Sequence, residues 1–223
     1  MFEIYLFIDP LNTLCFNVEK DTINLAKKRK NFRFRFIPIV NLQTIEQSLN
    51  YHSRNKQSIE ERNQAFQNAY FIALDIKAAE LQGRKYGVEF LLKIQQTFIS
   101  QNKFDHSIEY TKQCIDEIGA DLKAFLKDRN SDLSKKIFLR DQQLARELSI
   151  QYIPTAIIFD FNSEEDGIII EDYLLETLDM LGNKEIKSIY QLLNHLFLNH
   201  GMTLENKSEI YHKVKNKNKF HDI

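Results

Sequence analysis

The sequence predicts an α/β fold in which a β-α-β unit and a later β-β-α unit flank a helical insertion. Apolar residues run from Phe2 to Ile8 and stop at Asp9-Pro10, as expected of a buried strand closed by a turn. Phenylalanines then alternate with arginines over residues 32–36, which is the two-residue period of a strand with one solvated face. A long stretch of helical periodicity separates these strands from later apolar runs, and this order defines the fold class.

The N-terminal unit contains one helix between its strands. Apolar positions with helical spacing predict a helix from Asn12 to about Lys30, followed by a strand over residues 32–40. A strand-helix-strand unit of this length predicts two parallel strands with a right-handed crossover. Pro38 lies within the second strand and indicates that this strand is at an edge of the sheet, because proline cannot donate a ladder hydrogen bond.

Residues 58–150 carry helical patterns throughout. Ser58 and Glu61 have the spacing of a capping box, which predicts a helix start. Gly119 follows a later apolar stripe and has the position of a residue that ends a helix. A further helix is predicted over residues 132–148. These helices form one lobe inserted between strands.

The C-terminal part returns to β structure. A short polar segment joins two apolar runs, which predicts an antiparallel hairpin, and a helix follows. Lysines dominate the last residues, for which we expect a flexible tail. The expected organisation is an N-terminal part of the α/β fold, the helical lobe, a C-terminal part and the basic tail, with bounds 1–56, 57–148, 149–200 and 201–223.

Composition narrows the function classes. The 223 residues are 43% hydrophobic with a net charge of −1, so the chain has no overall bias towards nucleic acid or an anionic membrane. No apolar stretch approaches the roughly 18 residues of a membrane span. No basic segment precedes the first strand, so we expect no signal peptide, and the two cysteines fit a reducing compartment. A cytoplasmic protein is the expectation.

The candidate functional site is the turn between the first strand and the first helix. Cys15 lies in the first helical turn, where thioredoxin-like proteins keep a redox Cys-x-x-Cys, and Ile153-Pro154-Thr155 directly precedes a later apolar strand. The order of elements and these two signals resemble a thioredoxin-like fold (β-α-β... β-β-α) with a DsbA-like helical insertion. The resemblance implies that the Ile153–Pro154 bond is cis and lies beside the turn.

Residues 7–16, Phe-Ile-Asp-Pro-Leu-Asn-Thr-Leu-Cys-Phe, resemble the Phe-x-Asp-Pro-Leu-Cys-x-x-Cys-aromatic motif of one branch of this superfamily. That branch comprises the cytoplasmic DsbA-like adaptors of Gram-positive bacteria, of the YjbH/SpxH type, which deliver the regulator Spx to the ClpXP protease. The resemblance implies a stress-response adaptor for Spx or a similar client, with ClpXP as a further partner. The departure from the motif is Asn12, which stands where the first cysteine should be.

Asn12 changes the chemistry that the turn can perform. The first thiol of a Cys-x-x-Cys is acidified by the helix dipole and attacks, and the second resolves the mixed disulfide. Asn12 offers no thiolate but can accept hydrogen bonds as an N-cap. The degenerate redox motif Asn12, Thr13, Leu14 and Cys15 therefore indicates a non-catalytic protein with Cys15 as a buried thiol. The alternatives are a thiol-disulfide oxidoreductase or glutathione-dependent enzyme using Cys15 alone, or metal binding or intermolecular pairing by this thiol.

The resemblance also implies where a client binds. In thioredoxin folds the turn and the cis-proline loop border a shallow groove, and the backbone next to the proline can pair with an extended segment. The expected client contacts are Leu11, Asn12, Thr13, Ile153 and Pro154. An interaction module for another partner is the third hypothesis.

No cofactor or metal is expected, because the six histidines show no zinc-ligand spacing. Cationic residues crowd the first helix and second strand, and no basic residue lies between Asp160 and Asp179, a segment rich in acids. These charges either guard the sheet edges against aggregation or form a docking surface, and the sequence leaves both alternatives open.

Overall fold

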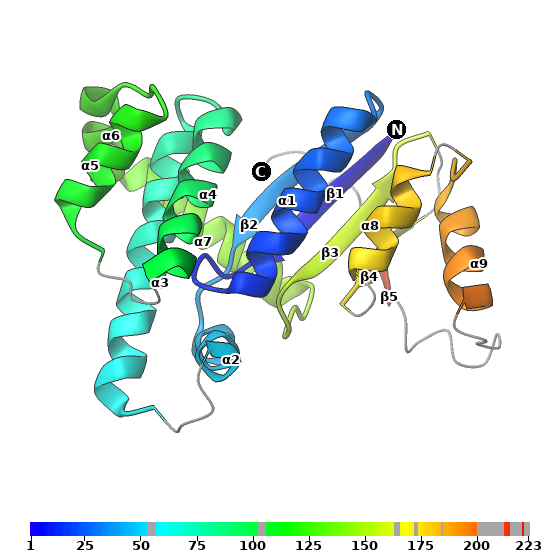
Figure 1. Ribbon diagram of the computed structural model, residues 1–223, viewed down its shortest axis with the longest axis horizontal. Helices are drawn as coiled ribbons and strands as arrows, with labels where there is room; N and C mark the ends of the chain where they lie inside the picture. Colours follow the sequence, from blue (N-terminus) through cyan, green and yellow to red (C-terminus); the bar gives the residue numbers. More distant parts are fainter. Residues whose placement is uncertain are drawn as a thin grey trace. The chain divides into compact units, whose positions relative to one another are not determined.

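The structure is a computed structural model, and it describes residues 1–52, 57–101, 106–162, 166–171, 174–183, 185–199, 212–214 and 220. Strands and helices both occur towards each end of the chain, and helices alone occupy its middle (Figure 1). The elements are, in order, β1 (Phe2–Ile8), α1 (Thr13–Lys28), β2 (Phe32–Pro38), α2 (Leu42–His52), α3 (Ile59–Glu80), α4 (Arg84–Gln101), α5 (Ile108–Glu117), α6 (Leu122–Arg129), α7 (Asp132–Glu147), β3 (Thr155–Asp160), β4 (Gly167–Ile170), α8 (Leu174–Gly182), α9 (Ile189–Asn199) and β5 (His212–Val214).

The described strands form one sheet in the order β2-β1-β3-β4-β5. Strand β3 runs antiparallel to both β1 and β4, with Ile158 opposite Ile4 on one side and Ile168 on the other. The amide of Phe2 donates to the carbonyl of Asn31, and the amide of Ile39 donates to the carbonyl of Ile8. The starts of β1 and β2 therefore lie side by side, as do their ends, so the two strands are parallel as predicted.

The positions of the strands follow from their sequences. Strand β1 is buried along its length except for Glu3, which suits an apolar run between two neighbours. Strand β2 is at the edge of the sheet, as Pro38 predicted, and its solvated start carries Arg33. The predicted hairpin is confirmed as β3 and β4.

The chain divides into two compact units, and unit 1 comprises Met1–Phe7, Asn17–Ile37 and Tyr152–Ile223. Arg29 belongs to the predicted basic run but is buried in this unit. Its guanidinium donates to the carbonyls of Leu181, in the last turn of α8, and of Asn183 and Ile186, which follow that helix. Arg29 therefore ties the end of α1 to the end of α8 and is not available for a partner.

The expectation of a flexible tail over residues 201–223 is corrected at four residues. Residues 212–214 form β5 and pair with β4, with Val214 opposite Gly167. The ring of Phe220 is buried against Tyr5 and Phe159. Apolar side chains in a lysine-rich segment supplied enough burial to order these positions. The rest of this tail lies outside the described residues.

Unit 2 comprises Ile8–Phe16 and Pro38–Gln151, so it contains more than the expected lobe over 57–148. Helix α3 is its centre and contacts α2, α4, α6 and α7. The capping box predicted at α3 is confirmed, since the Ser58 hydroxyl accepts from the Glu61 amide and the Glu61 carboxylate accepts from the Ser58 amide. Gly119 follows the end of α5 with a φ of +72°, as its predicted helix-ending role requires.

Three helices were absent from the sequence-based expectation, namely α2, α6 and α8. Helix α2 is 11 residues long and has apolar residues at Leu42, Ile45 and Leu49, of which Leu42 is 76% exposed, so its apolar stripe is short. After the hairpin, where one helix was expected, the structure has α8 and then α9, which begins at Ile189. These helices were difficult to predict because each has only a short run of apolar residues at helical spacing.

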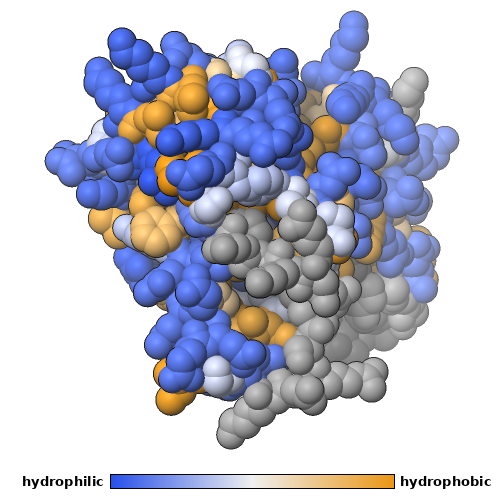
Figure 2. Space-filling view, turned by 60° about the vertical axis from the view of Figure 1, so that its left-hand side comes forward, coloured by the Kyte–Doolittle hydropathy of each residue, from blue (hydrophilic) through white to orange (hydrophobic). Residues whose placement is uncertain are grey.

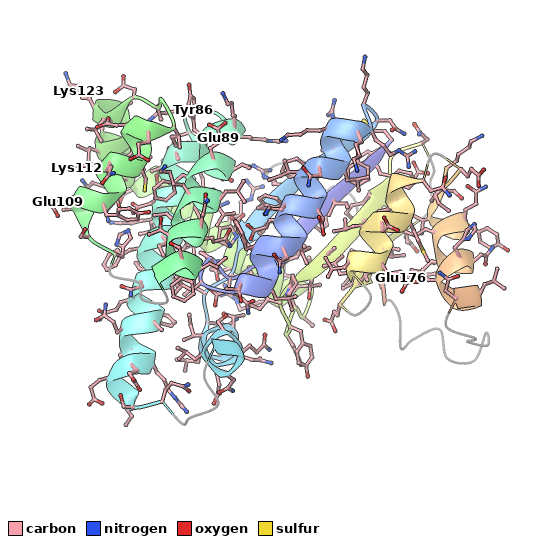
Figure 3. The ribbon with its side chains drawn as sticks, in the orientation of Figure 1. Tyr86, Glu89, Glu109, Lys112, Lys123 and Glu176 are labelled. Carbon is pink, nitrogen blue, oxygen red and sulfur yellow. The ribbon has the colours of Figure 1, made fainter. Side chains whose placement is uncertain are left out.

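The outer surface of unit 2 is mainly hydrophilic. Figure 2 brings the α3–α7 side forward and shows mostly hydrophilic side chains with scattered hydrophobic ones. Glu109 on α5 and Lys123 on α6 are exposed and point away from their helices (Figure 3). Among the residues that the structure describes, no helix is long and apolar enough to cross a membrane.

Candidate functional site: the turn before helix α1

The turn between β1 and α1 is built around Asp9. The Leu11 amide donates to Asp9 Oδ1 over 2.8 Å, and the Asn12 amide donates to the Asp9 carbonyl over 3.0 Å. An aspartate that accepts from the amide two residues later forms an Asx turn, which Asp-Pro sequences favour. This geometry ends β1 and directs the chain into α1.

Asn12 caps helix α1, as the sequence suggested. Its Oδ1 accepts from the Leu14 amide over 2.8 Å and from the Cys15 amide over 3.4 Å. The first amides of a helix lack intrahelical partners, and a side-chain oxygen at the N-cap satisfies them. In a Cys-x-x-Cys turn the attacking thiolate lies at this position next to the first amides of the helix, and in this chain the Asn12 amide oxygen lies there.

A third residue, Ser48 of α2, completes the site. The Asn12 side-chain amide Nδ2 donates to Ser48 Oγ over 3.1 Å, and the Ser48 hydroxyl donates to Asp9 Oδ2 over 2.6 Å. Asp9, Asn12 and Ser48 are all buried. Together they form a continuous chain of hydrogen bonds that we call the turn relay.

Asp9 is a buried carboxyl with neutral partners. Burial raises its pKa from 3.8 to about 6, while the Ser48 hydroxyl and the Leu11 amide lower the pKa and offset part of the effect. Desolvation dominates because removing a carboxylate from water costs more than two neutral donors restore.

Cys15 is fully buried, as is Cys114, and both are thiols and not a disulfide. A thiolate must be reached by its target before it can exchange disulfides. The burial of Cys15 therefore agrees with the interpretation of a packed thiol. Burial also raises the pKa of the Cys114 thiol on α5, which favours its neutral form.

The proline segment lies in unit 1. The Ile153–Pro154 bond is cis, as predicted. The Thr155 hydroxyl donates to the Tyr152 carbonyl over 2.6 Å, and Thr155 begins β3 opposite Phe7 of β1.

The expected client-contact residues differ in exposure. The side chains of Leu11, Asn12, Ile153 and Pro154 are buried, and Thr13 is partly exposed. The residue before the proline segment, Tyr152, is 56% exposed and had not been singled out from the sequence. Direct contact with a partner at the turn would therefore use Thr13 and backbone groups first.

Asp9 was predicted only as part of the turn that closes the first strand, and the role of Ser48 was not predicted. The Asx turn could have been recognised from Asp9-Pro10 alone. The Ser48 contact had no local signal, because 36 residues separate it from Asn12.

The acidic segment that begins at Asp160 takes part in an ion pair. Asp160 pairs with the N-terminal amine of Met1 over 3.3 Å, and residues 164, 165 and 172 of the acidic run lie outside the described residues. In the part of the chain that the structure describes, no three His, Cys, Asp or Glu residues are placed to hold a metal ion.

Comparison with known proteins places the chain in a family. A sequence model of the family described as Thioredoxin matches residues 5–180. The ClpXP adapter protein SpxH of Shouchella clausii is 30% identical over 224 residues, which cover 89% of this chain and 73% of that protein. The chain belongs to the thioredoxin superfamily, in the SpxH family.

Other SpxH proteins are similarly related. The SpxH proteins of Bacillus cereus and Bacillus subtilis are 32% and 30% identical, over 75% and 74% of this chain. The match spans 63% and 61% of these two relatives, so the chain corresponds to part of their length.

Solved structures support the DsbA-like fold. The cytosolic disulfide reductase DsbM from Pseudomonas aeruginosa matches with a TM-score of 0.57 at 13% identity, covering 81% of this chain and 95% of that one. The thiol-disulfide exchange protein α-DsbA2 from Wolbachia pipientis matches with a TM-score of 0.50 at 17% identity, covering 81% of each chain. The predicted thioredoxin-like α/β fold is confirmed.

Proposed function

We propose that this chain is a non-catalytic cytoplasmic adaptor that binds the regulator Spx and promotes its degradation by the ClpXP protease. The observation that carries the proposal is Asn12, a buried helix cap at the position of an attacking cysteine, in a chain whose relatives are named ClpXP adapter proteins.

The turn geometry supports binding without covalent chemistry. Thiol-disulfide exchange needs an attacking thiolate and a resolving thiol. Asn12 supplies an amide, and Cys15 is fully buried one turn further along α1. A client held at this turn is released according to affinity alone, which suits an adaptor that must hand its client to a protease.

In unit 2 the proposed contact is Thr13, the partly exposed side chain of the turn, and in unit 1 it is the backbone around Ile153 and Pro154. An extended client segment could pair with the backbone next to the proline by strand addition. Because Leu11 and Asn12 are buried, their proposed role is to shape the turn and not to form the contact surface.

Degradation of purified Spx by ClpXP tests this proposal. Spx should disappear faster with the protein than without it, at low and moderate salt. Thr13→Asp should slow this acceleration, because it places a charge on the turn while an acidic residue in the first turn of a helix leaves the fold stable. Asn24→Asp, at an exposed position further along α1, is the matched control. Equal degradation with and without the protein would reject the adaptor function.

The enzyme alternative has a separate test. A single-cysteine oxidoreductase or glutathione-dependent enzyme would lose activity on Cys15→Ser, whereas an adaptor would keep its effect on Spx. Insulin reduction and glutathione transfer should stay at background for the wild-type protein. Turnover that disappears in Cys15→Ser, with the fold intact, would favour the enzyme.

A further inference from the structure

We propose that Ser48 is a positioning residue of the client-binding turn, acting from helix α2 through the side chain of Asn12. This inference rests on the proposed function, because it assigns the group that sets the shape of the proposed binding turn. Ser48 belongs to no sequence motif, and its place becomes evident from the contacts of the folded chain.

The direction of the hydrogen bonds gives Ser48 this role. Ionised Asp9 can only accept, so the Ser48 hydroxyl must donate to Asp9 Oδ2. Ser48 Oγ is then the acceptor that faces the Asn12 side-chain nitrogen. This contact turns the Asn12 oxygen towards the amides of Leu14 and Cys15. Ser48 therefore selects which end of the Asn12 amide caps the helix.

Loss of the Ser48 hydroxyl would leave two buried groups without that partner. The Asn12 Nδ2 group and Asp9 Oδ2 are both in the buried relay. A buried polar group that loses its partner is unfavourable, so the Asn12 side chain is expected to move to regain one. Its movement would release the Leu14 amide and loosen the turn next to Thr13.

Helix α2 is itself fixed at both sides of Ser48. Asn41 Oδ1 accepts from the Thr44 amide over 2.9 Å, and the Thr44 hydroxyl accepts from the Asn41 amide over 3.2 Å, which caps the helix start. Ile45 is buried one turn before Ser48, and the Gln47 side chain donates to the Gln151 carbonyl. Because these contacts hold α2 in place, the Ser48 hydroxyl is held at a fixed position next to Asp9 and Asn12.

The affinity of the protein for fluorescently labelled, purified Spx measures the effect of Ser48 on client binding. Ser48→Ala should weaken binding by about tenfold, the effect of roughly one lost hydrogen bond. Ser48→Thr, which keeps the hydroxyl, should restore most of the affinity. Asn50→Ala changes an exposed residue of α2 outside the relay and should bind like the wild type. Unchanged affinity in Ser48→Ala would overturn the inference.

A double-mutant cycle separates positioning from a general structural role. If Ser48 acts through Asn12, Ser48→Ala should have no further effect on affinity in an Asn12→Ala background. An equal loss in both backgrounds would show that Ser48 acts by another route and would reject the inference.

Hydrogen exchange provides a readout that needs no client. Ser48→Ala should speed exchange of the Leu14 and Cys15 amides but not of the Glu61 amide, which the separate Ser58 cap protects. Unchanged exchange at Leu14, or equal acceleration at Glu61, would overturn the inference. If Spx does not bind the wild-type protein, the proposed function fails, and the exchange experiment still decides the role of Ser48.

Discussion

Two buried carboxylates of unit 2 are stabilised in opposite ways. Asp9 in the turn has neutral donors, the Ser48 hydroxyl and the Leu11 amide. Asp141 on α7 faces the ammonium group of Lys77 on α3 over 2.7 Å, and both side chains are almost completely buried. Lys77 also contacts Glu80 over 2.9 Å. One carboxylate is therefore compensated by hydrogen bonds alone and the other by a cation.

The consequences for ionisation differ. Burial raises the pKa of Asp9 to about 6 because neutral donors restore only part of the lost hydration. Burial lowers the pKa of Lys77, but the charges of Glu80 and Asp141 outweigh it and raise the pKa above its ordinary value. The Asp9 carboxyl therefore titrates near pH 6, whereas the raised pKa of Lys77 keeps its ammonium group charged.

Asp75 of α3 is a second example of the charged type. Arg129 of α6 contacts its Oδ1, and His106 contacts its Oδ2 over 2.7 Å. The helical region therefore uses ion pairs to fix its helices, while the turn uses neutral hydrogen-bond donors.

The largest expected effect comes from breaking the charged pair. Lys77→Met should lower the free energy of unfolding by about 3–5 kcal/mol, because it leaves Asp141 buried without its cation. Urea denaturation followed by circular dichroism measures this change. The double variant Lys77→Met with Asp141→Leu removes both charges and should recover most of the loss. A single variant as stable as the wild type would show that the pair carries no net stabilisation.

The second prediction concerns Asp9, the buried carboxyl whose hydrogen-bond partners are neutral. Asp9 has a higher pKa in the fold than its ordinary value of 3.8, so the fold keeps the proton after the unfolded chain has lost it. Stability from this group is complete below pH 4 and is lost as the pH rises through about 6, by roughly 3 kcal/mol. Subtracting the Asp9→Asn curve from the wild-type curve of unfolding free energy between pH 4 and 7 should isolate this slope. Parallel curves would contradict it.

Gly87 of α4 allows a test of Glu80, the second carboxylate that contacts Lys77. A Cβ added at this position would lie 2.3 Å from Glu80 Cγ and 3.3 Å from the Ile76 carbonyl oxygen. Gly87→Ala should therefore displace Glu80 from Lys77 and destabilise by about 1–3 kcal/mol, although alanine favours helices. Thermal unfolding measures the loss. Adding Glu80→Ala removes the clash with the side chain and should reverse part of it, whereas a stabilised Gly87→Ala protein would refute the explanation.

The smallest effect concerns the cap itself. Asn12→Ala removes the acceptor for the Leu14 and Cys15 amides and should cost about 1 kcal/mol in urea denaturation. Ser131→Ala removes the cap of α7, where the hydroxyl accepts from the Ser134 amide, and provides a comparison without the relay. If Asn12→Ala costs less than Ser131→Ala, the relay contributes nothing to the turn.

Several elements could be predicted because their signals are local. The apolar run of β1 ended at Asp9-Pro10, the Ser58 box began α3, and Gly119 followed α5, all as expected. The N-cap role of Asn12 also followed from its place before a helix. Backbone groups two to four residues apart determine such features, so the sequence contains them directly.

Other features escaped prediction because their partners are distant in the chain. Helix α2 has a reciprocal cap between Asn41 and Thr44, but it is only 11 residues long and its apolar stripe is correspondingly short. Ser48 lies 39 residues from Asp9, and Lys77 lies far from Asp141 in sequence, so no local pattern pairs them.

The sequence by itself determined the β-α-β unit, the β3–β4 hairpin, the edge position of β2 and the absence of an attacking cysteine at residue 12. Tertiary structure decided the ionisation of Asp9, the orientation of the Asn12 amide and the burial of Leu11 and Cys15. The physical reason is that burial and hydrogen-bond partners depend on which distant segments meet. The cost of a buried charge is fixed by those neighbours and not by the residue type.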